Sequence, residues 1–95
     1  MFINKTMNGN NNICGRNVAR LRKLKKLSQN QFASILQIHG LNVDKNAIQR
    51  IEAGKRFVTD IELIYLSDVL EIPVQKLLDR SELNATQENT YSRDA

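Results

Sequence analysis

The helical pattern is sharpest in two segments, LSQNQFASIL at residues 27–36 and VDKNAIQRIEAGKR at residues 43–56. In the first, Ser28 and Gln31 have the Ser-x-x-Gln spacing of a capping box, in which each side chain bonds the backbone of the other residue. This spacing predicts that a helix begins at Ser28 and ends near Gly40, a favourable left-handed terminator. The side of this helix that should be buried consists of Phe32, Ile35, Leu36 and His39.

The second segment predicts a helix of about residues 44–53 with one apolar and one polar side. Asp44 is a favourable N-cap, and Gly54 can adopt the left-handed conformation that ends a helix. The apolar side consists of Ala47, Ile48 and Ile51. The polar side consists of Lys45, Asn46, Gln49 and Arg50. Such a helix presents hydrogen-bonding side chains to solvent or to a partner.

Three further helices complete the prediction. Residues 15–26 show apolar residues at steps of three and four, which is typical of a helix. Thr59 and Glu62 form a second capping box, and the helix that follows must end before Pro73. A short last helix is predicted over about residues 74–79. No segment shows the alternating pattern of a strand, so we predict an all-α protein.

Length and composition allow one small domain. The helices predict a compact unit at residues 14–80, between an Asn-rich flexible arm at 1–13 and a polar flexible tail at 81–95. The single Cys14 excludes an internal disulfide and is interpreted as a small buried hydrophobe. No apolar run exceeds four residues, so we expect a cytoplasmic protein without a membrane segment. We expect no enzyme activity, cofactor, metal or small-molecule ligand, because no suitable cluster of reactive or ligating residues stands out.

The net charge of +4 conceals a strong asymmetry along the chain. Residues 1–58 carry eleven Lys and Arg against two acidic residues, whereas residues 59–95 carry three against eight. The two parts therefore have net charges of +9 and −5. A chain polarised in this way can present a basic surface to a polyanion such as nucleic acid. An ordinary solvated surface is the alternative interpretation of the charge pattern taken alone.

Read together, these features resemble the phage-repressor-like helix-turn-helix family of the Cro/C1, or xenobiotic-response-element, type. The resemblance rests on the capping Ser-Gln pair, the small Ala33, the Ile-Glu-x-Gly-Lys sequence at residues 51–55 and the closing pair Leu77-Leu78. It implies a compact five-helix, lambda-repressor-like helix-turn-helix domain. It also implies binding of double-stranded DNA, with the helix at about 44–53 in the major groove.

The resemblance also implies roles for individual side chains. The residues implied to read base edges are Lys45, Asn46, Gln49 and Arg50. The residues implied to contact DNA phosphate are Gln29, Asn30, Gln31, Lys55 and Arg56. Arg22 and Glu52 stand at the positions of a partly buried ion pair between the first and third helices, and we expect both to be structural.

At the level of function, the family implies a small stand-alone transcriptional regulator of prokaryotic or phage type, associated with the nucleoid. We expect a repressor that binds a pseudo-palindromic operator as a homodimer. A dimer contact through Val74 and Leu77 is one hypothesis, although both residues could instead complete the core. The alternative function is a helix-turn-helix protein-interaction module, antitoxin-like or anti-repressor-like, whose main partner is another protein. The basic character of residues 45–56 favours DNA.

The chain departs from the family pattern in three places. The connection at residues 37–43 is about five residues longer than the commonest form. We interpret the excess as an extra turn of helix through Ile38 or His39, with His39 partly packed. Lys26 and Glu71 stand where the family usually has a glycine that ends a helix, at an expected cost of about 1 kcal/mol each.

Overall fold

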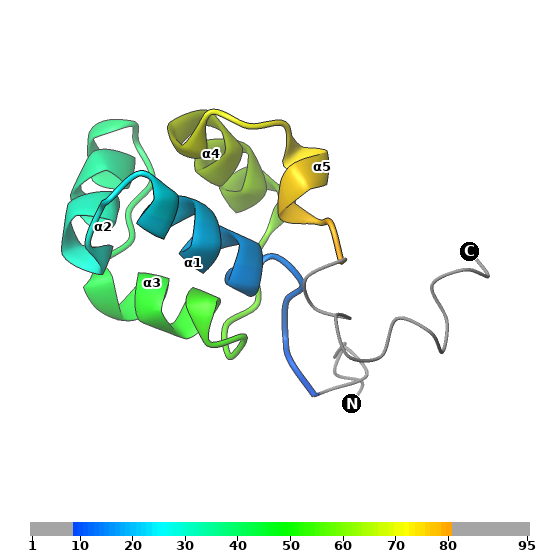
Figure 1. The fold of residues 1–95 in the computed structure, drawn as a ribbon. Coiled ribbons are helices and arrows are strands. Elements are labelled where there is room, and N and C mark those ends of the chain that lie inside the picture. The colour runs from blue at the N-terminus through cyan, green and yellow to red at the C-terminus, as the bar shows by residue number, and fades with distance from the viewer. Residues whose placement is uncertain (1–8, 81–95) are drawn as a thin grey trace.

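The computed structural model describes residues 9–80, which form five α-helices and no strand (Figure 1). The helices are α1 (Gly15–Leu24), α2 (Gln29–Ile38), α3 (Lys45–Glu52), α4 (Asp60–Leu70) and α5 (Val74–Leu77). Their number and order confirm the all-α prediction. Residues 1–8 and 81–95, which belong to the arm and the tail predicted from the sequence, lie outside the described residues.

The five helices enclose one apolar core. α1 crosses the middle of the domain and packs against α3, α4 and α5, while α2 packs against α3 and α4 (Figure 1). The core side chains are 3% exposed or less: Cys14, Val18, Phe32, Ala33, Leu36, Val43, Ile48, Ile51, Leu66, Leu70 and Leu77. Cys14 is buried as predicted, and this burial raises the pKa of its thiol to about 11. Because every helix contributes to the core, each depends on the others for its stability.

The helix starts are those that the capping residues predict. The hydroxyl of Ser28 accepts a hydrogen bond from the Gln31 amide at 3.0 Å, and the Gln31 side chain accepts one from the Ser28 amide at 2.8 Å. Thr59 and Glu62 make the same pair of bonds at the start of α4. The Asp44 carboxylate accepts a bond from the Ala47 amide at 2.8 Å. These contacts confirm both capping boxes and the N-cap of α3.

The first four helices end in one shared backbone geometry, the Schellman motif. In each, a residue with positive φ follows the helix, and two amides bond back to carbonyls three and five positions earlier. The residues with positive φ are Lys26 (61°), Gly40 (108°), Gly54 (77°) and Glu71 (60°). Lys26 and Glu71 are not glycine. A residue with a side chain is sterically disfavoured at positive φ, so the backbone is strained at the ends of α1 and α4.

Replacing Lys26 with glycine should therefore raise the free energy of unfolding by about 1 kcal/mol, because glycine adopts φ near 60° without a steric penalty. Urea denaturation measures this change. The matched control is Lys23→Gly, which places glycine inside α1 at another exposed lysine and should lower stability by about 1 kcal/mol. Equal losses in both variants would contradict the strained helix end.

Three details of the helix ends and their packing differ from the prediction. α1 ends at Leu24 and α5 ends at Leu77, each two residues before the predicted end of the helix. Of the closing pair Leu77-Leu78, which should pack together against the domain, only Leu77 lies in the core, whereas Leu78 is 41% exposed. His39 is exposed, with Nδ1 3.0 Å from the Ile35 carbonyl oxygen, so its predicted packing is wrong. α2 does extend through Ile38, as the interpretation of the long connection required.

Candidate nucleic-acid interface

The polar side of α3 is open to solvent. Its four candidate base-reading residues are exposed: Lys45, Asn46, Gln49 and Arg50. Within residues 9–80, none of these side chains makes a hydrogen bond or ion pair. At the helical rotation of 100° per residue they share one continuous arc of about 140°. Ile48 and Ile51, 0% and 1% exposed, lie away from this arc. The structure thus gathers these residues on one surface with their donors unused.

The start of α3 is held in place despite the long connection that precedes it. After Gly40, the Leu41 amide bonds the Leu36 carbonyl at 2.9 Å, which closes the end of α2. Val43 is 3% exposed, so the connection is fastened into the core just before α3. The Gln37 side chain donates to the Val43 carbonyl at 2.6 Å. The additional residues therefore form a defined turn that sets where α3 begins.

The end of α3 is tied to α1 and α2 through one carboxylate. Arg22 Nε and Nη2 donate to the two oxygens of Glu52 at 2.6 and 3.0 Å, and both side chains are less than 10% exposed. Arg22 Nη1 also donates to the Leu27 carbonyl at 2.7 Å. The hydrogen bonds from Arg22 to Glu52 raise the pKa of the arginine above its ordinary value. The ion pair therefore joins α1, its terminating turn and α3.

The first turn of α2 contributes three of the candidate phosphate-binding residues, which differ in exposure and in hydrogen bonding. Asn30 is exposed, and Gln31 is exposed with only its carbonyl oxygen used in the capping box. Gln29 is partly buried, and its amide nitrogen donates to Glu52 Oε1 at 3.0 Å. The side chain of Gln29 is thus held by the ion pair through one amide hydrogen, while the side chains of Asn30 and Gln31 are open to an incoming anion at a helix N-terminus.

The two basic candidates after α3 also differ. Lys55 is exposed, and its side chain has no partner within residues 9–80. Arg56 instead forms a bidentate ion pair with Glu62, at 3.0 and 3.1 Å. Burial acts to raise the pKa of Glu62, but the bonds from Arg56 and Thr59 outweigh it and hold that pKa below its ordinary value. Arg56 therefore braces the loop between α3 and α4, while Lys55 points its charge to solvent.

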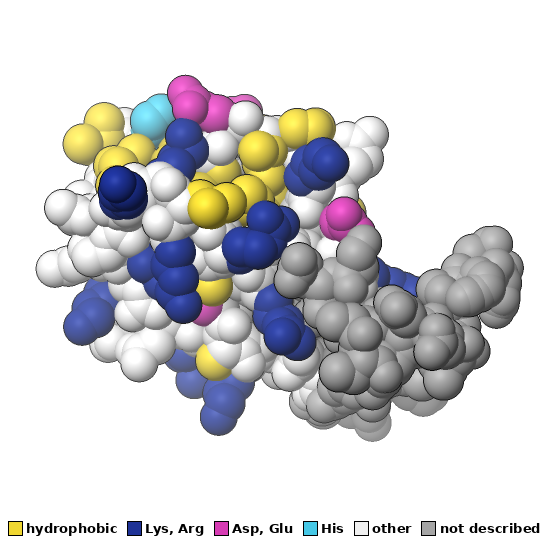
Figure 2. Space-filling view, viewed as in Figure 1, with side chains coloured by type: hydrophobic (Ala, Val, Ile, Leu, Met, Phe, Trp, Pro, Cys, Tyr) yellow, Lys and Arg dark blue, Asp and Glu magenta, His cyan; other side chains and the backbone are white. Residues whose placement is uncertain are grey.

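Basic side chains dominate the visible surface over α1 and extend towards the edge where α3 lies (Figure 2). Acidic side chains are fewer in this view and gather mainly at the opposite edge, near α4 (Figure 2). On this face, basic and acidic side chains are therefore separated in space. A surface of this kind attracts a polyanion from one side and favours one orientation of approach.

A comparison with protein families matches residues 18–77 to the helix-turn-helix family of the Cro/C1, or xenobiotic-response-element, type. The match runs from within α1 to the last residue of α5 and covers more than half of the chain. The chain belongs to the Cro/C1-type helix-turn-helix family. Comparisons with curated proteins and with solved structures found no match. Membership confirms the resemblance and the lambda-repressor-like fold, and it makes the protein a DNA-binding helix-turn-helix regulator.

In this Cro/C1-type domain, a residue that precedes the family match holds α3 against α1. Asn12 Oδ1 accepts a bond from the Gly15 amide at 2.8 Å. Its amide nitrogen donates to the Ile51 carbonyl at 3.1 Å and to the Arg56 carbonyl at 2.7 Å. A single side chain thus satisfies the first amide of α1 and two carbonyls at and beyond the end of α3. The only signal in the sequence is the general tendency of Asn side chains to bond nearby backbone groups, which does not point to α3.

The neighbouring residue extends this contact. The backbone amide of Asn11 donates to the Gly54 carbonyl at 2.7 Å, and the Asn11 side chain donates to the Lys55 carbonyl at 3.0 Å. Residues 10–13 fall within the predicted flexible arm of residues 1–13, and in the structure they lie against the end of α3. The reason is that a helix end leaves carbonyls unsatisfied, and consecutive Asn side chains can supply donors to them.

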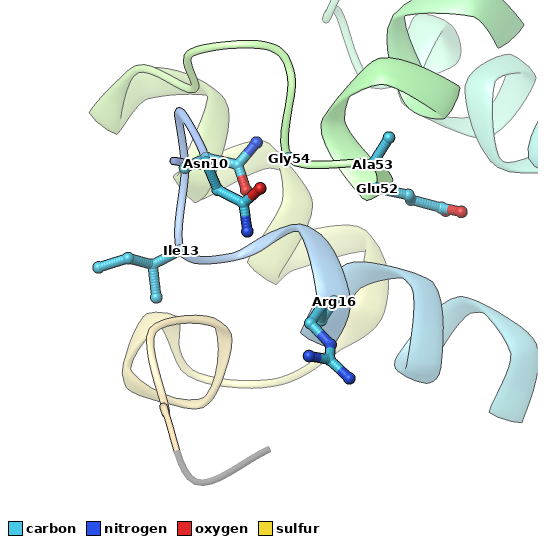
Figure 3. A pocket seen from close by; sticks show the side chains of 7 residues that line it. Asn10, Ile13, Arg16, Glu52, Ala53 and Gly54 are labelled. Carbon is cyan, nitrogen blue, oxygen red and sulfur yellow. The ribbon is translucent and has the colours of Figure 1, made fainter. Parts of the chain in front are cut away.

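A small pocket lies beside this contact (Figure 3). It has a volume of about 120 Å³ and lies between the end of α3 and the residues before and at the start of α1. The residues that line it are Asn10, Asn12, Ile13, Arg16, Glu52, Ala53 and Gly54.

In the described part of the chain, no group of three or more His, Cys, Asp or Glu could hold a metal ion. No helix of residues 9–80 has the length and hydropathy needed to span a bilayer.

Proposed function

We propose that this regulator binds a pseudo-palindromic operator in double-stranded DNA as a homodimer and represses transcription by occupying it. The observation that carries the proposal is the open polar arc of α3, with four side chains that have no partner within residues 9–80. α3 would lie in the major groove, with its N-terminal residues against base edges. The basic surface around it would supply attraction that does not depend on sequence.

The four side chains have the chemistry needed to distinguish bases. Arg50 and Lys45 can donate to guanine O6 and N7, and Asn46 and Gln49 can make two bonds with adenine. Each well-placed pair discriminates against a wrong base by about 1–3 kcal/mol. Asp44 is used as the N-cap, so we assign it no base contact. A surface with two cations and two amides is suited to an operator that contains both guanine and adenine.

Phosphate contacts would flank the groove on both sides of α3. Asn30 and Gln31 lie at the N-terminus of α2, where free backbone amides favour an anion. Lys55 supplies a cation after α3. Gln29 can join them through the second hydrogen of its amide nitrogen while the first stays on Glu52. Arg56 would contribute mainly by holding the loop that carries Lys55, because Glu62 occupies its guanidinium.

Selection of bound sequences from a random duplex pool, at near-physiological salt, tests the proposal. We expect the purified chain to enrich a pseudo-palindromic site. A promoter overlapped by that site should then lose transcription in vitro when the protein is added. If no motif is enriched by a chain that melts cooperatively, the proposal fails and the protein-interaction function becomes the better one.

Two alanine variants separate base reading from phosphate binding. Arg50→Ala should weaken binding to the selected site by about 1–3 kcal/mol and flatten the preference at one base pair, with little effect on random DNA. Lys55→Ala should weaken binding to all sequences alike and reduce the salt slope by about one phosphate contact. Titrations of both duplexes at several salt concentrations measure these effects. Equal losses on operator and random DNA for both variants would remove Arg50 from the base-reading set.

A further inference from the structure

Three consecutive asparagines, which precede the family match, close over the loop that follows α3. The match begins at residue 18, and we call residues 10–12 the strap. Asn10 lies beside the turn at Gly54, where a Cβ on the glycine would come within 2.7 Å of the Asn10 side chain (Figure 3). Asn11 and Asn12 donate four hydrogen bonds to the carbonyls of residues 51, 54, 55 and 56. The strap therefore fixes the backbone of this loop.

Lys55 is the residue of the loop whose charge the fold leaves open. The neighbouring Arg56 guanidinium is bonded to Glu62, whereas the Lys55 side chain is exposed and has no partner within residues 9–80. The backbone of Lys55, by contrast, is bonded at both ends. Its amide donates to the Arg50 carbonyl at 2.9 Å, and its carbonyl accepts from the Asn11 side chain at 3.0 Å. The loop thus presents the Lys55 ammonium on a fixed backbone.

The bond from Asn11 to the Lys55 carbonyl adds little to the stability of the fold. It lies at the surface, where water would otherwise supply a donor to that carbonyl, so the net gain from the exchange is small. α3 is already held against α1 by the buried ion pair of Arg22 and Glu52. What the bond reduces is the conformational freedom of the backbone that carries Lys55.

A fixed backbone matters for a lysine that has to meet a phosphate. The side chain of lysine is long and flexible, and ordering both the side chain and its loop on binding costs free energy. A loop that is ordered before binding leaves only the side chain to be ordered, so more of the attraction appears as affinity. Because a phosphate contact carries no sequence information, this gain should be the same on every duplex.

We propose that Asn11 is a positioning residue for DNA binding, which holds the loop after α3 so that Lys55 meets a phosphate. Asn12 extends the same hold to the last turn of α3 through its bond to the Ile51 carbonyl. The proposal rests on the function proposed above, in which Lys55 contacts phosphate. It adds the strap, which precedes the matched helix-turn-helix unit, to the parts of the chain that DNA binding needs.

A double-mutant cycle tests whether Asn11 acts through Lys55. Titrations of the selected site and of a random duplex compare wild type with Asn11→Ala, Lys55→Ala and the variant that carries both changes. Asn11→Ala should weaken binding about threefold on both duplexes and keep its cooperative melt. In the Lys55→Ala background the same change should have no further effect, because no lysine remains to be positioned. The matched control is Gln75→Ala, which removes an exposed amide side chain on α5 and should bind like wild type.

Trypsin digestion of the free chain measures the hold on the loop without DNA. Trypsin cleaves after lysine, and a loop that opens more often is cut faster. Cleavage after Lys55 should be about threefold faster in Asn11→Ala than in wild type, because one bond to the Lys55 carbonyl is lost. Gln75→Ala should be cut at the wild-type rate.

Three results would overturn the proposal. They are an equal loss of affinity in the wild-type and Lys55→Ala backgrounds, faster cleavage without loss of affinity, and an unchanged cleavage rate in Asn11→Ala. Failure of the proposed function reads out differently. Wild type would then bind neither duplex, or Lys55→Ala would bind both as tightly as wild type, while cleavage after Lys55 would still be faster in Asn11→Ala.

Discussion

Replacing Glu52 with alanine is expected to lower the free energy of unfolding by about 3–5 kcal/mol, because it leaves the buried Arg22 guanidinium without its counter-ion. The Arg22 side chain is 9% exposed and cannot regain full hydration while the domain stays folded. Gln29 loses its acceptor in the same step. A domain of this size has a total stability of only about 5–15 kcal/mol. Urea denaturation at neutral pH should therefore show a much lower midpoint.

The control for this variant is Glu71→Ala, which removes the exposed ion pair with Lys25. Glu71 is 75% exposed, so solvent replaces the lost contact and the midpoint should hardly move. Glu52→Gln keeps a hydrogen-bond acceptor and the volume of the side chain, so its denaturation midpoint should lie between those of Glu52→Ala and Glu71→Ala. If Glu52→Ala melts like wild type but no longer binds DNA, Glu52 acts at the interface, and the structural assignment is wrong.

Gly15→Ala should destabilise the domain by about 3 kcal/mol, although alanine is the better helix former by about 1 kcal/mol. A Cβ at this position would overlap the Ile51 carbonyl oxygen and come within 2.9 Å of Asn12 Oδ1. The Ile51 carbonyl is backbone in the last turn of α3, so it can move only if α3 moves. The variant should thus lose operator affinity as well as stability. Thermal melts and DNA titrations measure the two effects.

Ser34→Ala provides the comparison, since it improves helix propensity at an exposed position of α2. It should leave stability unchanged or raise it by a few tenths of a kcal/mol. An increase in stability for Gly15→Ala that matches this control would mean that α1 and α3 do not approach each other as closely as the structure shows.

The helices and their caps were predictable because they depend on contacts within a few residues. Ser28 with Gln31, and Thr59 with Glu62, bond across three positions, so their spacing in the chain is also their geometry. The strained ends at Lys26 and Glu71 followed instead from the family resemblance, because the family usually has glycine at these two helix ends. The polar arc of α3 could be predicted as well, because helical rotation alone separates its polar residues from Ile48 and Ile51.

The long-range partners of the candidate site were not predictable from composition or spacing. Arg56 carries the same charge as Lys55, and only the packing of α4 beside the loop commits it to Glu62. Gln29 looks like an open phosphate ligand until α3 brings Glu52 within 3.0 Å.

From the chain alone come the number and order of the helices, their capped starts, the buried and polar sides of α3, and the family. These properties follow from propensity, capping and periodicity, which act within one or two helical turns. Tertiary structure alone decided that Asn12 holds the end of α3 across 39 and 44 residues, and that Gly15 admits no side chain. It did so because helix ends leave carbonyls that distant donors must satisfy, and because close packing fixes which backbones meet.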